Sequence, residues 1–445
     1  MNLQDMNLQF PQEPMRPIEK PIFKPGQPPE PPHVHTLWGV HDPAIYHDEE
    51  DNQYYIYTTG GNSHRSSDMI TWNIIGHVMD DPPKESTDWV GGNAIWAPDL
   101  IKVGDEYRMY GSNSTIGVRQ SCIFLATSDK PEGPYHSKGV VLKTAYDSHC
   151  NSIDANIITE EGSGQQYMIY GSFWGGIHIL KLNNETGFAD EEGIGTCIAR
   201  RPKFADCAIE GPYIRYNPDT GYYYLFVSYA SLRSDYNIRV GRSRNLFGPY
   251  YDHNGRDMRD LEDYNNDLGY MIACGYQFNK GTSWMAPGHN SVLRDFDNQW
   301  YLVCHVREEY FKTGTLSTMH VYKMLWSEDG WPMLNPSRYA GETQQDFKPE
   351  YIPGTYERIK LTPTIPQGIH KSTKWELMED GMLKSGCVMG HWELIDSSTI
   401  CLSYGNIVEY CKLSVIWDWD LWKPTISFTG KDQMGICVWG KRVEE

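Results

Sequence analysis

The sequence predicts an all-β protein, a five-bladed β-propeller followed by a small C-terminal β-barrel or sandwich domain. Three observations support this fold class. A short segment with one polar side chain recurs five times, each copy is followed by an aromatic run of strand composition, and the repeat stops near residue 353 while strand-like alternation continues. Four short strands per unit, repeated radially, are typical of propeller blades.

The recurring segment is the clearest sign of the repeat. The five copies are HDPAI, WAPDL, SIDANI, IEGPYI and GHNSVL, with polar residues Asp42, Asp99, Asp154, Glu210 and His289. Successive polar residues are 57, 55, 56 and 79 positions apart. About a dozen residues later come aromatic runs such as YYIYTTG and YYYLFVSY, and then a third strand-like element such as IHILKL. Units of this length and composition predict five blades.

The repeat also divides the chain into domains. Residues 1–35 form a Pro-rich N-terminal arm, with nine prolines between positions 11 and 32, which we expect to be extended on the surface or mobile. Residues 36–353 are the propeller, and residues 354–445 are an accessory all-β domain. The tryptophans of this last domain either form a carbohydrate-binding surface or pack in its core, and core packing is the favoured alternative.

Composition limits the possible partners. The chain carries 39 Lys and Arg against 58 Asp and Glu, a formal charge of −19, which argues against nucleic-acid and anionic-membrane partners. Its 30 Tyr and 15 Trp suit stacking against sugar rings, although β-sheets also favour such residues.

Cellular location is predicted from cysteines and from the N-terminus. The ten cysteines are scattered without a C-x-x-C pair, which indicates buried free thiols in a reducing compartment. The first residues lack a basic region followed by an apolar one, and no apolar run reaches the length of a membrane span. We therefore expect a cytoplasmic protein, or a secreted one if a signal has been removed.

Asp42 raises the question of function, because Pro43 holds it extended at the start of a strand. It either caps a turn or faces a ligand. In a propeller the first strand of each blade lines the central channel, so the five polar residues converge at one mouth. Crowded carboxyls repel one another, and such an arrangement is typical of a functional site.

These motifs, together with YGSFWGGI, resemble the five-bladed enzymes of glycoside hydrolase family 43, most of all the α-1,5-L-arabinanases, over residues 36–340. The resemblance implies that Asp42 is the general base, Glu210 the general acid and Asp154 the residue that orients the acid and raises its pKa. It also implies a metal ion, usually Ca²⁺, beside His289. A core histidine is the alternative for His289, and His305 is a lesser candidate for the metal.

Substrate contacts are predicted at five further residues. Trp96, Phe173 and Trp174 are candidates for stacking on sugars, with core packing as the alternative. Asn156 is a candidate to hydrogen-bond a substrate hydroxyl, and Asp99 has either a structural or a substrate-hydroxyl role.

The favoured hypothesis is an inverting hydrolase of α-1,5-linked L-arabinan or arabino-oligosaccharides. Exo-type release is favoured over internal cutting, because a cytoplasmic enzyme would meet short imported substrates. A β-xylosidase or α-L-arabinofuranosidase of the same fold and a non-catalytic glycan-binding propeller are the alternatives. The sequence does not predict the oligomeric state.

Overall fold

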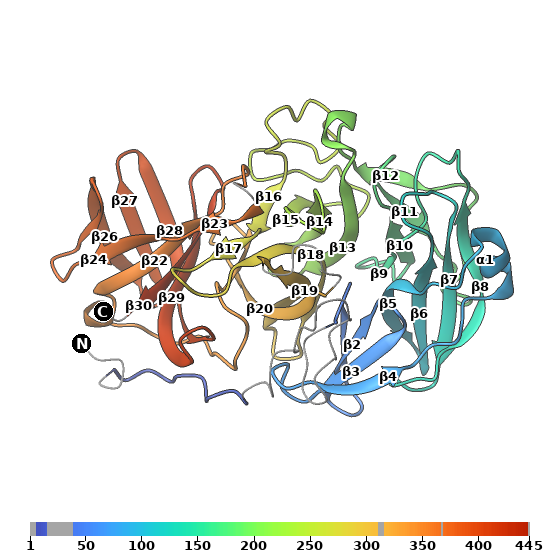
Figure 1. Cartoon of the computed structure of the whole chain (residues 1–445), viewed down its shortest axis with the longest axis horizontal. Helices are drawn as coiled ribbons and strands as arrows, with labels where there is room; N and C mark the ends of the chain where they lie inside the picture. The colour runs from blue at the N-terminus through green and yellow to red at the C-terminus, as the bar shows by residue number, and fades with distance from the viewer. Residues whose placement is uncertain (1–5, 16–38, 310–315, 366–367, 444–445) are drawn as a thin grey trace, which may run out of the picture.

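Regular structure in this chain is almost entirely β-strand. The computed structural model describes residues 6–15, 39–309, 316–365 and 368–443. The longest helix in this part of the chain is α1 (Lys84–Val90), and no helix there is long and apolar enough to cross a membrane. The strands form five blade sheets and one closed barrel (Figure 1). The predicted fold class, a five-bladed propeller with a C-terminal β domain, is confirmed.

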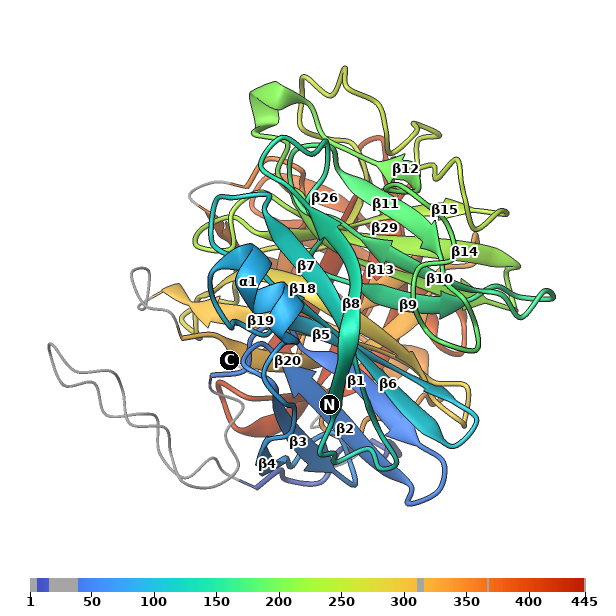
Figure 2. The same ribbon diagram turned by 90° about the vertical axis from the view of Figure 1, so that its right-hand side faces the viewer.

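The first three blades are four-stranded antiparallel sheets in which strand order follows chain order from the channel outward. Blade 1 contains β1 (Ala44–Asp48), β2 (Gln53–Thr58), β3 (Asn62–Ser66) and β4 (Asn73–His77). Blade 2 contains β5 (Trp96–Val103), β6 (Glu106–Asn113), β7 (Ser121–Ser128) and β8 (His136–Thr144). Blade 3 contains β9 (Asn156–Thr159), β10 (Gln166–Tyr170), β11 (Ile177–Lys181) and β12 (Thr196–Ala199). Blades 2 and 3 face the viewer in Figure 2.

The last two blades carry the additional length of the repeat. Blade 4 contains β13 (Ile209–Asn217), β14 (Tyr222–Tyr229), β15 (Asn237–Ser243) and β16 (Tyr270–Ala273), with a long connection before its last strand. Blade 5 contains β18 (Trp284–Arg294), β19 (Trp300–Glu308), β20 (Thr318–Trp326) and β21 (Pro332–Leu334), and its sheet is extended by β17 (Tyr276–Gln277) and β23 (His370–Lys371).

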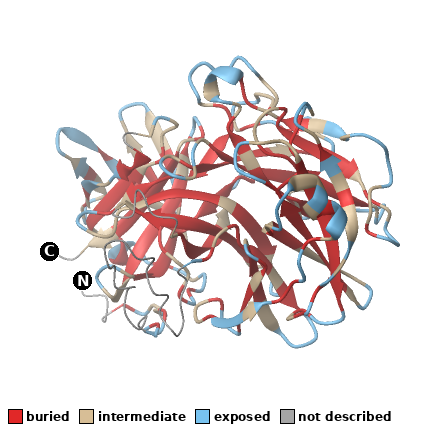
Figure 3. Cartoon of the chain, turned by 45° about the vertical axis from the view of Figure 1, so that its right-hand side comes forward, coloured by how far each residue is buried: buried red, intermediate tan, exposed pale blue. Residues whose placement is uncertain are grey.

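The predicted aromatic runs are the second strands of the blades, β2, β6, β10, β14 and β19. Most of their tyrosines are buried between neighbouring sheets, and Tyr57, Tyr110, Tyr170 and Tyr229 are at most 1% exposed. Figure 3 shows the resulting pattern, in which the strands are buried and the connecting loops are exposed. Aromatic side chains suit this position because they bury a large area between two twisted sheets.

The C-terminal domain is an antiparallel barrel that closes by pairing of its first and last strands. Its strands are β22 (Gly354–Lys360), β24 (Thr373–Leu377), β25 (Met382–Ser385), β26 (Val388–Asp396), β27 (Thr399–Tyr404), β28 (Ile407–Asp418), β29 (Lys423–Asp432) and β30 (Cys437–Val443). Trp375, Trp392, Trp417 and Trp439 are buried, whereas Trp419 and Trp422 are half-buried. The core-packing alternative therefore holds for four of these six tryptophans.

The barrel lies next to blade 5 in Figure 1. The short strands β17 and β23 pair in parallel across the junction. Lys431 of the barrel forms an ion pair with Asp329 of blade 5, with 2.9 Å between Nζ and Oδ2. Residues 6–15 of the predicted N-terminal arm also lie on this side, since Met6 packs into the barrel core. Residues 16–35 of the arm lie outside the described residues.

Candidate active site

A left-handed backbone residue stands near the start of the inner strand in blades 1 to 4 and in the middle of β18 in blade 5. These residues are Asp42, Ala97, Asp154, Gly211 and His289, with φ of 52°, 38°, 62°, 55° and 48°. Asp42 is therefore left-handed and not extended, contrary to the expectation from Pro43. Four of the five carry a side chain, for which this conformation costs about 1–3 kcal/mol. Strain of this kind persists where the surrounding structure holds it, commonly at functional sites.

The left-handed residues are the equivalent positions of the five blades, and they do not all coincide with the five polar residues that the sequence motifs align. Asp99 lies two positions after the equivalent residue of blade 2, Ala97, and Glu210 lies one position before Gly211. The strand pairing of blade 2 also shifts register between Trp96 and Asp99. Because side chains alternate along a strand, a shift in position changes what a residue contacts.

In blades 2, 3 and 5 the side chain two positions after the left-handed residue joins the blade to the next one. Asp99 Oδ2 accepts hydrogen bonds from the Ile157 backbone N–H at 2.8 Å and from Asn156 Nδ2 at 3.0 Å. Asn156 Oδ1 in turn accepts one from the Ile214 N–H at 2.9 Å. Ser291 Oγ accepts from the Ile45 N–H at 3.0 Å, which links blade 5 to blade 1.

The structure favours a structural role over substrate contact for both Asp99 and Asn156. Asp99 is 4% and Asn156 is 2% exposed, and their polar atoms bond within the protein. The structural role, one of the two alternatives for Asp99, is the one that the structure shows. Burial raises the pKa of Asp99 to about 6, although its hydrogen bonds from Ile157 and Asn156 act in the opposite direction.

Polar residues at the ends of the second strands hold the left-handed positions, and of these only His305 was singled out from the sequence, as a metal candidate. The backbone N–H groups of Ala97, Asp154, His289 and Asp42 donate to Thr59 Oγ1, Ser112 Oγ, Ser228 Oγ and His305 Nδ1, respectively. A hydroxyl at the end of an aromatic run, as in YTTG and YGSN, was the available signal.

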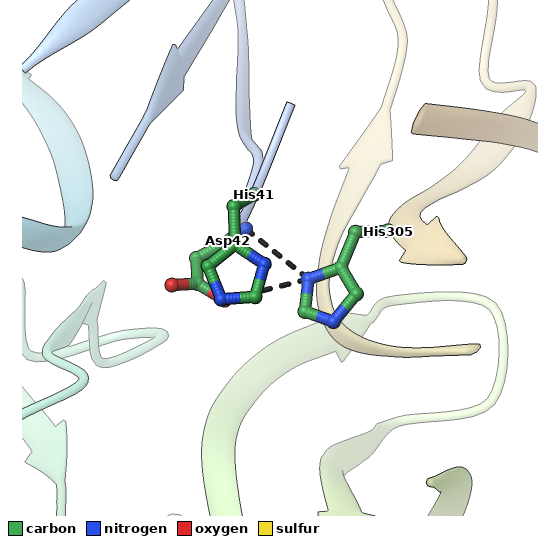
Figure 4. Close-up of side chains that lie close together, drawn as sticks. All are labelled: His41, Asp42 and His305. Atoms are coloured by element: carbon green, nitrogen blue, oxygen red, sulfur yellow. Dashed lines mark hydrogen bonds and ion pairs between the residues drawn. The ribbon is translucent and has the colours of Figure 1, made fainter. Parts of the chain in front are cut away.

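Asp42 is held among histidines and one hydroxyl. Its Oδ2 accepts a hydrogen bond from Thr59 Oγ1 at 2.6 Å, and its Oδ1 lies 3.2 Å from His289 Nδ1 and 3.4 Å from His305 Nδ1. His41 and His305 stack on each other beside it, with ring centroids 4.3 Å apart (Figure 4). Burial opposes ionisation of Asp42, but the histidines lower its pKa well below the ordinary value.

Asp154 and Glu210 behave in the opposite way. Burial raises the pKa of Asp154 well above the ordinary value, and the nearby Glu210 and Asp42 carboxyls raise it further. Burial also raises the pKa of Glu210, while His289 and hydrogen bonds from Ser172 and Tyr236 lower it in part. Ser172 Oγ donates to Glu210 Oε2 at 2.9 Å, and Asp154 Oδ2 accepts from the Gly211 N–H at 3.2 Å.

The three predicted acids thus share one site and differ in charge. Asp42 is the carboxylate, and Asp154 and Glu210 hold protons to a higher pH than ordinary carboxyl groups. A carboxylate beside a carboxylic acid is the equipment for general base and general acid catalysis. Tyr236, which is 1% exposed and hydrogen-bonded to Glu210, is a further residue of this site that the sequence analysis missed.

Two histidines compete for the predicted metal position. His289 Nδ1 faces Asp42, whereas His305 Nε2 is buried without a hydrogen-bond partner among the described residues. His305 also forms a possible metal-binding group with His41 and Asp42. Binding of a metal through Nε2 requires the tautomer in which the His305 Nδ1–H faces the Asp42 carboxylate, because a ring whose Nδ1 accepts from the Asp42 N–H carries its proton on Nε2. One carboxylate oxygen is a poor match for Ca²⁺, so most of its ligands would have to be water.

The predicted stacking residues Trp96, Phe173 and Trp174 are half-buried. Phe173 and Trp174 have φ of 53° and 38° and lie just before the strand β11 of blade 3. The Arg119 guanidinium lies 5.4 Å from the Trp174 ring. Contact with a sugar stays a prediction for all three residues.

A propeller mouth that holds one carboxyl group of lowered pKa beside two of raised pKa has the equipment of a glycoside hydrolase. Comparison with known proteins gives the family. Residues 38–332 match the model of glycosyl hydrolases family 43, and residues 336–440 match a C-terminal lipocalin-like domain of that family. The chain belongs to glycosyl hydrolases family 43 and is a glycosidase.

Similar proteins span both domains. An extracellular endo-α-(1→5)-L-arabinanase of Thermotoga petrophila is 33% identical, over 91% of this chain and 94% of the relative. Extracellular endo-α-(1→5)-L-arabinanase 2 of Bacillus subtilis is 31% identical, over 95% of this chain and 94% of the relative. The crystal structure of an endo-1,5-α-L-arabinanase from Thermotoga petrophila superposes with a TM-score of 0.83 at 32% identity, covering 91% of this chain and 98% of that one.

These relatives overturn the expectation of a cytoplasmic protein, because both are described as extracellular enzymes. The cysteines were a misleading signal. All ten are free, seven are buried and Cys387 alone is exposed. A buried thiol packs as a small apolar group and is shielded from oxidants, so it reports little about the compartment.

Proposed function

We propose that this glycosidase hydrolyses α-1,5-linked L-arabinan and arabino-oligosaccharides with inversion, and that it cuts within the chain. The observation that carries this proposal is the split of pKa values at one mouth, where the pKa of Asp42 is lowered and those of Glu210 and Asp154 are raised. In an inverting reaction the carboxylate activates water and the acid protonates the leaving oxygen. Asp42 is the base, Glu210 the acid, and Asp154 orients the acid; because Asp154 and Glu210 are neighbouring carboxyl groups, ionisation of both is disfavoured.

The arabinan substrate is supported by the two relatives that match over both domains, which are named as arabinanases. The same names indicate endo attack, against the exo-type release that the sequence analysis favoured. Exo-type release was expected because a cytoplasmic enzyme would meet short imported oligosaccharides, and this reason does not apply to an extracellular enzyme. With linear arabinan, we expect viscosity to fall rapidly relative to reducing ends, with a ladder of product sizes.

Substitution tests the assigned roles. We expect Glu210→Gln and Asp42→Asn to lower kcat on arabino-oligosaccharides by about 10²- to 10⁴-fold while the circular dichroism spectrum stays native. Glu379→Gln is the matched control, because Glu379 is exposed on the barrel. Near-normal kcat in either site variant would contradict its role. Proton NMR should show the β-anomer as the first product, whereas an initial α-anomer would indicate a covalent intermediate.

Substrate specificity is tested with a panel of glycosides. Linear arabinan should be cleaved faster than xylobiose and the nitrophenyl glycosides of xylose and arabinose. Activity confined to the nitrophenyl glycosides would instead identify an enzyme that removes terminal sugars. Binding of arabinan without any cleavage would identify a glycan-binding propeller.

The calcium ion is part of this proposal, with His305 Nε2 as its protein ligand and water supplying oxygen ligands. The support is the buried ring nitrogen of His305, which has no other partner among the described residues. Such an ion would add positive charge beside Asp42 and favour its ionised form.

A further inference from the structure

Two exposed aromatic side chains stack on each other outside the site of the three acids. Phe204 belongs to the short turn η2 (Lys203–Ala205), and Tyr264 belongs to the long connection before β16. Figure 1 draws both segments at its upper edge. Their ring centroids are 5.2 Å apart with an interplanar angle of 12°, yet Phe204 is 57% and Tyr264 is 76% exposed. Large aromatic rings exposed as a pair often mark a binding surface.

The two segments that carry these rings are bonded to each other beneath them. Arg201 Nη2 donates a hydrogen bond to Asn266 Oδ1. Arg200 donates through its backbone N–H to Met258 O at 3.0 Å and through Nε to Arg259 O at 3.2 Å. These bonds fix the two segments relative to each other. A surface that is already ordered loses little entropy when it binds a ligand.

The Tyr264 segment is also held from within by Asp263, which is fully buried. Asp263 Oδ1 accepts hydrogen bonds from the backbone N–H groups of Asp267 at 2.9 Å and Leu268 at 3.1 Å. Arg239, also fully buried, donates to Leu268 O at 3.0 Å and to Asn266 O at 3.2 Å. The exposed position of Tyr264 is therefore the result of an ordered connection.

A polar pocket is formed by the same two segments. It has a volume of about 480 Å³ and is lined by Arg200, Asp257, Arg259 and Asp260. Two guanidinium groups and two carboxylates balance in charge, and Arg259 pairs with Asp257 at 2.6 Å. A balanced set of donors and acceptors suits a neutral ligand with many hydroxyl groups better than an anion.

The aromatic pair is close to the catalytic site along the chain. Phe204 precedes Glu210 by six residues, so it lies at most about 22 Å from the acid even if the segment were fully extended. A turn in this segment, where the Cys207 N–H donates to Pro202 O, shortens that distance. One polysaccharide chain can therefore contact both places.

We propose that Phe204, Tyr264 and the adjoining pocket form a second carbohydrate-binding site, which holds the arabinan polymer while another part of it is cleaved. The aromatic rings stack on the sugar rings, and Arg200 and Asp260 bond their hydroxyl groups. The substrate identity rests on the proposed function; the site itself rests on the aromatic pair and the pocket.

Native gel electrophoresis in the presence of linear arabinan tests the site directly. The protein carries Glu210→Gln in every lane, so that the polymer stays intact. We expect Phe204→Ala with Tyr264→Ala to weaken retardation about tenfold, and each single variant to weaken it less. Tyr410→Ala is the matched control, because Tyr410 is 54% exposed on the barrel strand β28, and it should be retarded as strongly as its parent.

Kinetics provide a second measurement with the active enzyme. We expect the double variant to lower the ratio of kcat/KM on linear arabinan to kcat/KM on arabinotriose about tenfold, and Tyr410→Ala to keep the ratio of the unsubstituted enzyme. Unchanged retardation and an unchanged ratio in the double variant would overturn this inference and leave the proposed function standing. If the active enzyme cleaves no arabinan but the Glu210→Gln protein is retarded through Phe204 and Tyr264, the site stands and the proposed function fails.

Discussion

Replacement of Asp99 by Asn should stabilise the protein without removing its activity. Asp99 is 4% exposed, and its Oδ2 accepts hydrogen bonds from the Ile157 N–H and from Asn156 Nδ2. The carbonyl oxygen of an asparagine can accept both bonds. The substitution therefore keeps the link between blades 2 and 3 and removes a group that is costly to ionise in this position.

The expected change in the free energy of unfolding follows from the pKa of Asp99. Burial raises the pKa of Asp99 to about 6 from an ordinary 3.8, and each pKa unit corresponds to about 1.4 kcal/mol, so the difference is worth about 3 kcal/mol. The unfolded chain releases this proton near pH 4, whereas the folded protein keeps it until about pH 6. The folded state binds more protons in that interval, so stability falls as pH rises through it and is constant above it. The Asp99→Asn variant does not lose stability in this pH interval, because asparagine does not ionise.

Thermal unfolding at pH 4 and at pH 7 measures the effect. At pH 7 we expect Asp99→Asn to raise Tm by roughly 6 °C, at about 2 °C per kcal/mol for a large domain, and at pH 4 by much less. Asp99→Leu, which removes the acceptor and leaves the Ile157 N–H unpaired, should lower Tm at both values. Equal Tm changes for Asn at the two pH values would refute the argument from ionisation. Loss of kcat in Asp99→Asn would restore the substrate-hydroxyl role.

Three further predictions concern the site itself. Asp154→Asn should lower kcat by about 10²- to 10⁴-fold. It should nevertheless raise Tm at neutral pH, because the folded enzyme no longer holds a buried carboxyl group whose pKa is raised. A lower Tm would contradict this argument. Tyr236→Phe should move the alkaline limb of kcat/KM to higher pH, since the hydrogen bond from Tyr236 lowers the pKa of Glu210, and an unmoved limb would exclude that influence. Chelation should lower the Tm of the unsubstituted enzyme but not of His305→Ala, and elemental analysis should find the ion in His289→Ala but not in His305→Ala. The reverse result would assign the ion to His289.

The sequence by itself determined the architecture and the three acids. Each blade needs four short strands and aromatic side chains to fill the space between sheets, so the same pattern recurs along the chain and can be recognised without coordinates. Asp42, Asp154 and Glu210 lie in these recurring segments, and the family resemblance supplied their roles. The C-terminal barrel was predictable for a similar reason, because alternation along its strands is a local property.

Only the tertiary structure decided what each polar side chain contacts. Asp99 lies in a recurring segment like the acids, but it stands two positions after the left-handed residue Ala97, where its carboxyl group accepts the bond from the next blade. Phe204 and Tyr264 are 60 residues apart and meet because two connections pack together. The pKa split also depends on contacts between blades, since His289 and His305 of blade 5 lie beside Asp42 of blade 1. Repetition is local and is visible in the sequence, whereas register, burial and charge proximity arise only when distant segments pack.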